Sequence, residues 1–256
     1  MEIKLKYCQL KKKFERLVSY KSRNTYPRIV TLINFNLLGC IFIVSDRMEE
    51  FRIEQYGDEE EFTRIILDEI RPGDVFYDIG ASVGLITVHA CKKGALVVAF
   101  EPEDSIRERL NENLKLNRLD NFILVDWAVT DKTGTVELYT DGINGWSPSF
   151  LPIGKSGRKI VSMDTLDQAL KRKAFPEPDI IKIDIEGAEL MALRGMMGLL
   201  GSINAPRTIF IEIHSDYLSQ MGSYPEEIHN FLISHGYSLK DSFTRSAQLH
   251  CVYTKC

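Results

Sequence analysis

The hydrophobic positions of the chain form short apolar runs that alternate with segments of helical periodicity. The runs have the length and the β-branched and aromatic content of buried strands, and they span residues 75–79, 95–100, 121–126, 179–184 and 208–213. Helices are predicted over residues 58–70, 85–91, 105–117, 186–200 and 224–235. Closing strands are predicted at residues 237–240 and 248–253. This alternation indicates an α/β fold with a doubly wound sheet.

The beginning of the chain is basic. Residues 1–28 contain nine Lys or Arg and two acidic residues. Apolar residues recur there at the spacing of a helix face: Tyr7, Leu10, Phe14 and Leu17. We expect a basic amphipathic helix, which either packs against the rest of the chain or contacts an anionic membrane, glycolipid or nucleic acid.

Residues 28–36 and 38–45 flank a turn and predict a β-hairpin. With the basic helix, this hairpin forms an expected N-terminal extension, residues 1–56. The expected catalytic domain then spans residues 57–256.

The turn after the first strand of the domain points to a cofactor. A dinucleotide site would show G-x-G-x-x-G, but here the middle glycine is missing and Asp78 lies two residues before the first one. A carboxylate beside the turn disfavours a pyrophosphate and suits a ligand that carries an ammonium and a sulfonium. Glu101 ends the next strand, where an acid accepts both ribose hydroxyls. We expect S-adenosylmethionine rather than NAD, bound by Asp78, Gly80, Ala81, Ser82, Gly84 and Glu101.

Two more segments are candidates for ligand contacts. Asp126 and Trp127 follow the third strand, where they either bind adenine or form a turn acid beside a core tryptophan. Residues 141–157 are rich in Gly and Pro around Trp146 and Phe150, and they form either a lid over the substrate or a surface loop. Farther on, Asp164 is expected to cap a short helix.

Acidic residues and a histidine gather at the predicted carboxyl ends of the later strands. Asp184 and Glu186 are two residues apart, so their carboxylates point the same way on an extended backbone. His214 follows the strand of residues 208–213 and is a candidate base, while Glu189 is expected to complement a helix dipole. Asp184, Glu186 and His214 are the expected catalytic residues. Together with Glu212 they could also bind Mg²⁺, but the spacing does not require an ion and we predict no metal.

The composition of the chain narrows the class of protein. A net charge of −4, with 44% hydrophobic and 27% charged residues, is typical of a soluble globular protein and gives no general argument for nucleic-acid binding. The five cysteines are scattered, which argues against a disulfide framework and a zinc site and favours a reducing compartment. No signal peptide is visible, and the apolar stretch 29–44 is too short to span a bilayer. A cytoplasmic protein is expected.

The sequence resembles the FkbM-type S-adenosylmethionine-dependent methyltransferases between roughly residues 39 and 214. The motifs that carry the resemblance are DIGASVG at 78–84, FEP at 100–102, NENLKLN at 111–117, WAVTDKTGTVEL at 127–138, SMDTLD at 162–167 and KIDIEGAEL at 182–190. The resemblance implies a class I methyltransferase fold, a Rossmann-like seven-stranded sheet, mostly parallel with an antiparallel last strand and helices on both faces. It also implies O-methylation of hydroxyls in carbohydrates or natural products, with Asp184 and Glu186 beside the reacting centre.

We therefore expect an O-methyltransferase that acts on a hydroxyl of a carbohydrate, a lipid-linked sugar or a small metabolite. A nucleic-acid methyltransferase anchored by residues 1–28 is an alternative, although no Pro-Pro-aromatic tetrapeptide follows residues 179–184. A non-catalytic methyltransferase-like subunit and an NAD-dependent oxidoreductase are further alternatives. The sequence does not predict the oligomeric state.

Overall fold

The computed structural model describes residues 26–33, 39–56, 59–145, 147–245 and 248–256. The helix face expected at residues 7–17 lies outside this part of the chain. So does Trp146 of the expected lid or surface loop. No helix in the described ranges is long and apolar enough to cross a membrane.

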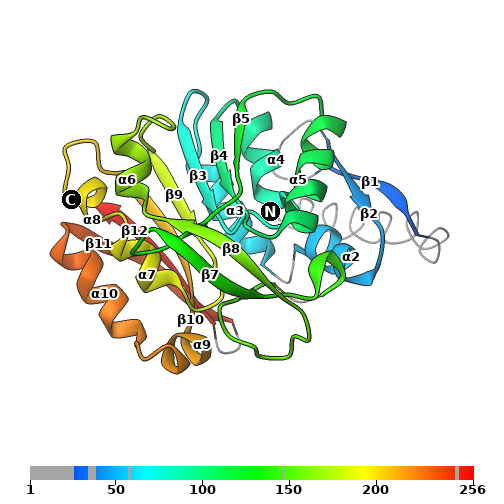
Figure 1. Cartoon of the computed structure of the whole chain (residues 1–256). Coiled ribbons are helices and arrows are strands. Elements are labelled where there is room, and N and C mark those ends of the chain that lie inside the picture. The colour runs from blue at the N-terminus through cyan, green and yellow to red at the C-terminus, as the bar shows by residue number, and fades with distance from the viewer. Residues whose placement is uncertain (1–25, 34–38, 57–58, 146, 246–247) are drawn as a thin grey trace, which may run out of the picture.

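A seven-stranded sheet forms the centre of the molecule (Figure 1). In the order of the sheet, its strands are β11 Tyr237–Arg245, β12 Gln248–Lys255, β10 Thr208–His214, β9 Ile180–Ile183, β3 Val75–Ile79, β4 Leu96–Phe100 and β5 Phe122–Val125. The pairs from β10 to β5 are parallel, whereas β12 runs antiparallel to both of its neighbours. The mostly parallel seven-stranded sheet with an antiparallel last strand is thereby confirmed.

Helices cover both faces of this sheet (Figure 1). One face carries α3 Glu60–Glu69, α4 Leu85–Lys92 and α5 Asp104–Leu116. The other carries α6 Leu166–Lys171, α7 Glu189–Arg194, α8 Met197–Leu200 and α10 Pro225–Ser234, and α9 Ser215–Gln220 follows β10. Successive residues of a strand point to opposite faces, so Phe76 belongs to the first core and Tyr77 to the second. Because the central strands are buried on both faces, their sequences are continuous runs of apolar residues.

The predicted hairpin at the start of the chain is confirmed. β1 Arg28–Leu32 pairs antiparallel with β2 Cys40–Val44, and β2 shares the core of α3, α4 and α5. The helix α2 Arg47–Glu54 follows and was not expected. The division of the chain at residue 56 stays a prediction.

A second, separate sheet has three strands. β7 Gly134–Tyr139 pairs antiparallel with β8 Arg158–Asp164, and β6 Ala128–Val129 pairs parallel with β8 and completes the sheet. The expected cap Asp164 ends β8, and Thr165 caps α6 by accepting a hydrogen bond from the backbone N–H of Gln168. Asp164 instead accepts from the side chains of Thr133 and Arg172.

The single helix expected over residues 186–200 is also corrected. Glu186 and Gly187 have left-handed backbones, with φ of 53° and 99°, so the first helical residue is Glu189. The helix is interrupted at Gly195, where a Cβ would lie 1.9 Å from the carbonyl oxygen of Thr130. Glu186 therefore lies in a turn beside the end of β9.

Candidate active site

The site lies at the carboxyl ends of the central strands. β3 stands between β4 and β9, at the point where the chain changes its direction of progress across the sheet. In open α/β sheets such a point is where ligands bind. Asp78 lies on β3, Glu101 follows β4, Asp184 follows β9 and His214 ends β10. The sheet thus brings together four of the residues predicted from the sequence.

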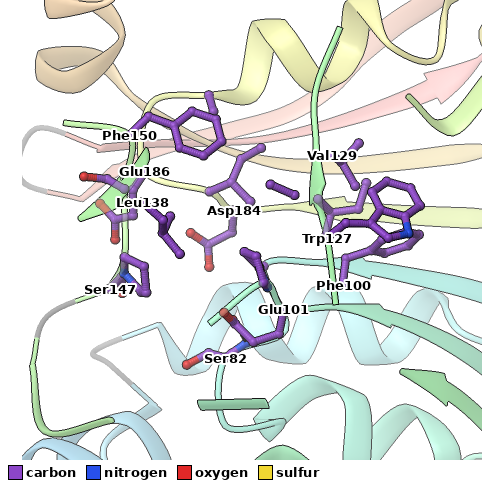
Figure 2. Close-up of a pocket in the computed structure, with 18 residues that line it drawn as sticks. Ser82, Phe100, Glu101, Trp127, Val129, Leu138, Ser147, Phe150, Asp184 and Glu186 are labelled. Atoms are coloured by element: carbon purple, nitrogen blue, oxygen red, sulfur yellow. Dashed lines mark hydrogen bonds between the residues drawn. The ribbon is translucent and has the colours of Figure 1, made fainter. Parts of the chain in front are cut away.

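A first cleft of about 660 Å³ opens at this edge (Figure 2). Figure 2 shows Phe100 and Trp127 on one side of it and Ser147 and Phe150 on the other. Residues that line it also include Ser82, Glu101, Val129, Leu138, Asp184 and Glu186. It is an apolar slot with carboxylates at one edge, which suits a nucleoside whose base is apolar and whose sugar is polar.

Glu101 is the buried acid of this cleft, with 4% of its surface exposed. Its two carboxylate oxygens accept hydrogen bonds from the backbone N–H groups of Ser82 and Glu103, each at 3.0 Å. Burial raises the pKa of Glu101 to about 7, although these two hydrogen bonds act in the opposite direction. Each oxygen keeps a second lone pair, so the carboxylate is fixed in orientation and can still accept from ribose hydroxyls.

Asp78 is 1% exposed and is held by Lys182 and Thr87. The hydroxyl of Thr87 donates to Asp78 at 2.6 Å, and Nζ of Lys182 lies 3.2 Å from both Asp78 and Asp184. Lys182 also donates to the carbonyl oxygen of Gly80 at 2.8 Å. Burial lowers the pKa of Lys182, but the two carboxylates outweigh it and raise that pKa above its ordinary value. Lys182 therefore ties the ends of β3 and β9 together as a permanent cation.

The glycine turn after β3 is shaped by close packing. Gly80 has φ of 84°, and a Cβ there would lie 1.9 Å from the carbonyl oxygen of Asp184. Gly84 precedes α4, and a Cβ there would lie 2.2 Å from Leu110 on α5. Gly80 and Ser82 line the cleft, while Gly84 has a packing role and does not appear among its lining residues in the described chain.

The two residues expected at the adenine differ in their surroundings. Trp127 lines the first cleft and meets Phe100 edge to face, with ring centroids 5.3 Å apart. Asp126 is exposed and is not among the described residues that line this cleft. A contact of either residue with adenine stays a prediction.

A second cleft of about 890 Å³ adjoins the first. The two share five lining residues: Gly80, Ser82, Ser147, Asp184 and Glu186. Its other walls carry Asp78, Ala81, the aromatic side chains of Phe51 and Tyr56, and the cations Arg52, Lys182 and Arg245. Asp184 and Glu186 therefore lie at the junction of two connected clefts.

His214 is surrounded by carboxylates. Its Nδ1 lies 2.8 Å from Glu189, and its Nε2 lies 3.5 Å from Glu186, 3.5 Å from Glu212 and 3.9 Å from Asp184. Burial lowers the pKa of His214, but the hydrogen bond to Glu189 and the nearby carboxylate charges outweigh it and raise that pKa to about 10. The three residues expected to be catalytic are thus in one group. Glu189 fixes the orientation of the imidazole, in addition to the interaction with the helix dipole that was expected of it.

Two members of the surroundings were not predicted from the sequence. Glu59 precedes α3, and His250 lies on β12 directly opposite Glu212 of β10. The one feature of the sequence that could have indicated His250 as a site residue is its place as a histidine in an otherwise apolar strand. Its partner depends on the register between two strands, which the sequence does not reveal.

The loop of residues 141–157 contributes to both clefts. Ser147, Pro148, Ser149 and Phe150 line the first cleft, and Ser147 also lines the second. Arg52 of α2 donates to the carbonyl oxygens of Ile143, at 2.8 Å, and of Gly145. The loop therefore forms a wall of the site, and its opening and closing as a lid stays a prediction.

Comparison with known proteins agrees with this geometry. A family model described as "Methyltransferase FkbM domain" matches residues 78–239, more than half of the chain. The chain belongs to the FkbM methyltransferase family. It is a methyltransferase whose cofactor is S-adenosylmethionine, as expected from Asp78 and Glu101.

Individual relatives add detail. The hexuronic acid methyltransferase AglP of Haloferax volcanii is 28% identical over 179 residues, which cover 68% of this chain and 70% of that protein. Ribosomal RNA small subunit methyltransferase A of Thermotoga petrophila is 32% identical over 92 residues, 34% of this chain and 30% of that protein. The crystal structure of a methyltransferase FkbM from Methylobacillus flagellatus matches with a TM-score of 0.53 and 18% identity, over 81% of this chain and 52% of that one. The last likeness confirms the class I methyltransferase fold.

The residues of the first cleft fit S-adenosylmethionine. The Glu101 carboxylate would accept from ribose hydroxyls, and Phe100, Trp127 and Val129 form an apolar wall that an adenine ring would fit. Oδ1 of Asp78 is buried and lies 3.2 Å from Nζ of Lys182, so the charge of Asp78 is shared with this lysine. The cofactor supplies a methyl group on a sulfonium when bound.

Proposed function

We propose that the protein transfers a methyl group to a hydroxyl oxygen of a carbohydrate, and that an acidic sugar such as a hexuronic acid is the preferred acceptor. The observation that carries the proposal is the second cleft, which meets the first at Asp184 and Glu186. Its aromatic side chains suit the apolar face of a sugar ring, and Arg52 suits a carboxylate, whereas Arg245 already pairs with Glu59. The relationship to AglP, a hexuronic acid methyltransferase, supports the same acceptor class.

The roles of the acceptor-side residues follow from their positions. Asp184 and Glu186 border both clefts, so each can accept a hydrogen bond from the acceptor hydroxyl where methyl transfer takes place. One of them also holds the proton that the hydroxyl gives up. His214 contacts both carboxylates and, through Glu189, keeps them in place. The loop with Ser147 and Phe150 excludes water from the junction.

The acceptor is tested by incubating the protein with methyl-labelled S-adenosylmethionine and matched sugars. Methyl glucuronoside, methyl glucoside and an RNA oligonucleotide represent the acidic sugar, the neutral sugar and nucleic acid. We expect label on the glucuronoside in excess of the glucoside and none on RNA. A methyl ether survives treatment with alkali, whereas a methyl ester on the carboxylate does not, so the same product shows which oxygen was methylated.

Two variants separate catalysis from binding alone. Asp184→Asn is expected to abolish transfer while the protein still binds S-adenosylhomocysteine in calorimetry. Glu226→Gln, an exposed change on α10, is the matched control and should leave both unchanged. Unaltered transfer by Asp184→Asn would contradict the assigned role. Binding of the cofactor product without transfer to any acceptor would favour a non-catalytic subunit.

A further inference from the structure

The carboxylate of Glu212 lies between two buried histidines. Glu212 is 2% exposed, and the ion pairs it makes among the described residues are with Nε2 of His214, at 3.5 Å, and Nε2 of His250, at 3.4 Å. Each histidine faces a different oxygen of the carboxylate. Ligand-type atoms of Asp184, Glu212 and His214 lie within 4.8 Å of one another, and so do those of Glu59, Glu212 and His250. We call these five residues the Glu212 cluster.

The backbone explains why these side chains meet. Glu212 and His214 are two apart on β10, so they point to the same face of the sheet. Glu212 and His250 are direct partners in the antiparallel pairing of β10 with β12. Asp184 follows β9, the parallel neighbour of β10. Four of the five residues thus lie on or directly after three adjacent strands, which is a rigid support for a binding site, and Glu59 joins them from the start of α3.

The ring of His214 is oriented as in a metal ligand. Oε1 of Glu189 accepts from the backbone N–H of Gly187 at 2.8 Å and lies 2.8 Å from Nδ1 of His214, so Nδ1–H is the donor. Nε2 is left facing the oxygens of Asp184, Glu186 and Glu212 at 3.5–3.9 Å. Histidines that bind metals commonly donate their other ring N–H to a carboxylate in this way. Cis ligands of an ion with bonds of about 2.1 Å lie about 3 Å apart, close to the observed spacing.

His250 supplies an independent observation. It is 1% exposed, and neither ring nitrogen has a hydrogen-bond partner among the described residues. Phe62 stacks on the ring with centroids 4.4 Å apart, and Phe243 meets it edge to face at 5.2 Å. The aromatic side chains exclude water from the ring and aim Nε2 at Glu212. Such a group is costly to bury unless a partner binds it.

We propose that the Glu212 cluster binds a divalent transition-metal ion, with Glu212 as the central ligand. Each group of ligand atoms around Glu212 contains one imidazole with carboxylates, a set that favours Mn²⁺, Fe²⁺, Co²⁺ or Zn²⁺ over Mg²⁺ and Ca²⁺, which prefer oxygen ligands alone. Glu59 and Asp184 line the second cleft, so an ion can reach Glu212 from there. If the proposed function holds, the ion lies beside the acceptor and binds one of its oxygens; the metal site itself does not depend on that function.

A proton on Nε2 of His214 is the alternative occupant of the space between the carboxylates, and metal titration separates the two. The full chain is purified in the presence of a chelator, dialysed and titrated with Mn²⁺ in a calorimeter. Binding of Co²⁺ is followed by its visible absorption, and Mg²⁺ serves as the comparison ion. We expect stoichiometric binding of Mn²⁺ and Co²⁺, and weaker binding of Mg²⁺.

Variants locate the ion. Glu212→Gln is expected to abolish binding. His214→Gln and His250→Gln show which side of the carboxylate holds the ion, because loss of a ligand ring should weaken binding by more than the roughly 10–100-fold that loss of an outer-shell partner costs. Glu226→Gln is the control and should bind as the wild type does. Binding of S-adenosylhomocysteine and circular dichroism report on folding of each variant. Because Mn²⁺ binding needs no acceptor, it can succeed where the methyl-transfer assay fails, and the reverse.

The results that overturn the proposal are equally direct. A wild-type protein that folds, binds S-adenosylhomocysteine and takes up no Mn²⁺ or Co²⁺ has a proton instead of a metal ion in this space. A Glu212→Gln protein that binds the ion as tightly as the wild type has its metal site elsewhere.

Discussion

Glu101 is a buried carboxylate whose charge changes with pH near neutrality. Its pKa is raised by burial from 4.5 to about 7, so the folded protein holds a proton on this group where the unfolded chain does not. Stability contributed by this group therefore falls as the pH rises from about 4.5 to about 7. The charged form, present above pH 7, is the better acceptor for ribose hydroxyls. With the role predicted for Glu101 at the ribose, fold stability and cofactor affinity should respond to pH in opposite directions.

The first prediction follows from this opposition. From pH 6 to pH 8, wild-type protein should bind S-adenosylhomocysteine more tightly, whereas Glu101→Gln should bind weakly with little dependence on pH. Relative to the wild type, Glu101→Gln should gain stability over the range pH 4.5–8, by up to about 3 kcal/mol at about 1.4 kcal/mol per pKa unit. Calorimetry and urea unfolding at several pH values measure the two trends. A parallel pH dependence in wild type and variant would assign the titration to another group.

Gly80 gives the second prediction, with Gly73 as its matched control. Both have a left-handed backbone, with φ of 84° and 90°, so alanine is strained at either position by about 1–2 kcal/mol. Only at Gly80 would the added Cβ meet another chain segment, the carbonyl of Asp184 at 1.9 Å; at Gly73 nothing lies within 4 Å.

We expect Gly80→Ala to lose about 1–3 kcal/mol more than Gly73→Ala in urea unfolding, and to lose binding of S-adenosylhomocysteine as well. Gly73→Ala should bind it normally. Equal effects of the two substitutions on stability and binding would show that the end of β9 yields to the new methyl group.

At the residue scale, the sequence predicts what is local and misses what depends on pairing between distant strands. Asp78 and Glu101 could be placed because each lies at a strand end within one strand–turn–helix–strand unit. His250 and Glu59 could not be placed beside Glu212, because the pairing of β12 with β10 fixes the first and the start of α3 fixes the second.

At the scale of elements, α5 has a second task beyond covering the sheet. The side-chain amide of Asn117 accepts from the backbone N–H of Ile41 at 2.8 Å and donates to its carbonyl at 2.6 Å. Asn113 accepts from the N–H of Ile43 at 2.9 Å and donates to the carbonyl of Val83 at 2.9 Å. The helix thus binds the backbone edge of β2 as a neighbouring strand would, and this explains two of the three asparagines of the NENLKLN motif.

The third prediction tests this docking. Asn117→Ala leaves the two backbone groups of Ile41 without their partner, which should cost about 1–3 kcal/mol and speed hydrogen exchange of the Ile41 amide. Asn111→Ala, the same change on the opposite side of α5 by helical geometry, should do neither. Exchange followed by NMR and urea unfolding measure the effects. Unchanged protection at Ile41 would mean that the core contacts of Phe42 and Val44 hold the hairpin without the amides.

Element boundaries show where hydrophobic patterns succeed. The run 75–79 corresponds to β3 because a strand buried on both faces is apolar throughout. The hydrophobic pattern did not predict helix α2, because part of the surface that this helix buries is polar. Glu49 is fully buried and pairs with Arg109 of α5. The break between α7 and α8 was not predicted; it lies at Gly195, where the carbonyl of Thr130, far away in the sequence, leaves no room for a side chain.

At the scale of the whole molecule, the site joins segments from the beginning, middle and end of the described chain. Arg52 comes from α2, Ser147 from the loop of residues 141–157, and Arg245 from β11. The half-buried guanidinium of Arg52 reaches across to the loop and donates to the carbonyls of Ile143 and Gly145. Burial lowers the pKa of Arg52, and the charges of Glu101 and other nearby acids oppose that change. Arg52 therefore links the N-terminal segment to the wall of both clefts.

The last prediction concerns this link. Arg52→Met keeps much of the length of the side chain but removes its donors, so the loop loses its attachment to α2. Faster hydrogen exchange in residues 142–150 and weaker binding of S-adenosylhomocysteine should follow, by roughly tenfold if about 1.4 kcal/mol of loop ordering must then be supplied on binding. Arg47→Met, an exposed change on the same helix, is the control and should leave both unchanged. If the loop exchanges as slowly in Arg52→Met as in the wild type, its position is set by its own contacts, such as those of Asp141 with Ser156 and Gly157.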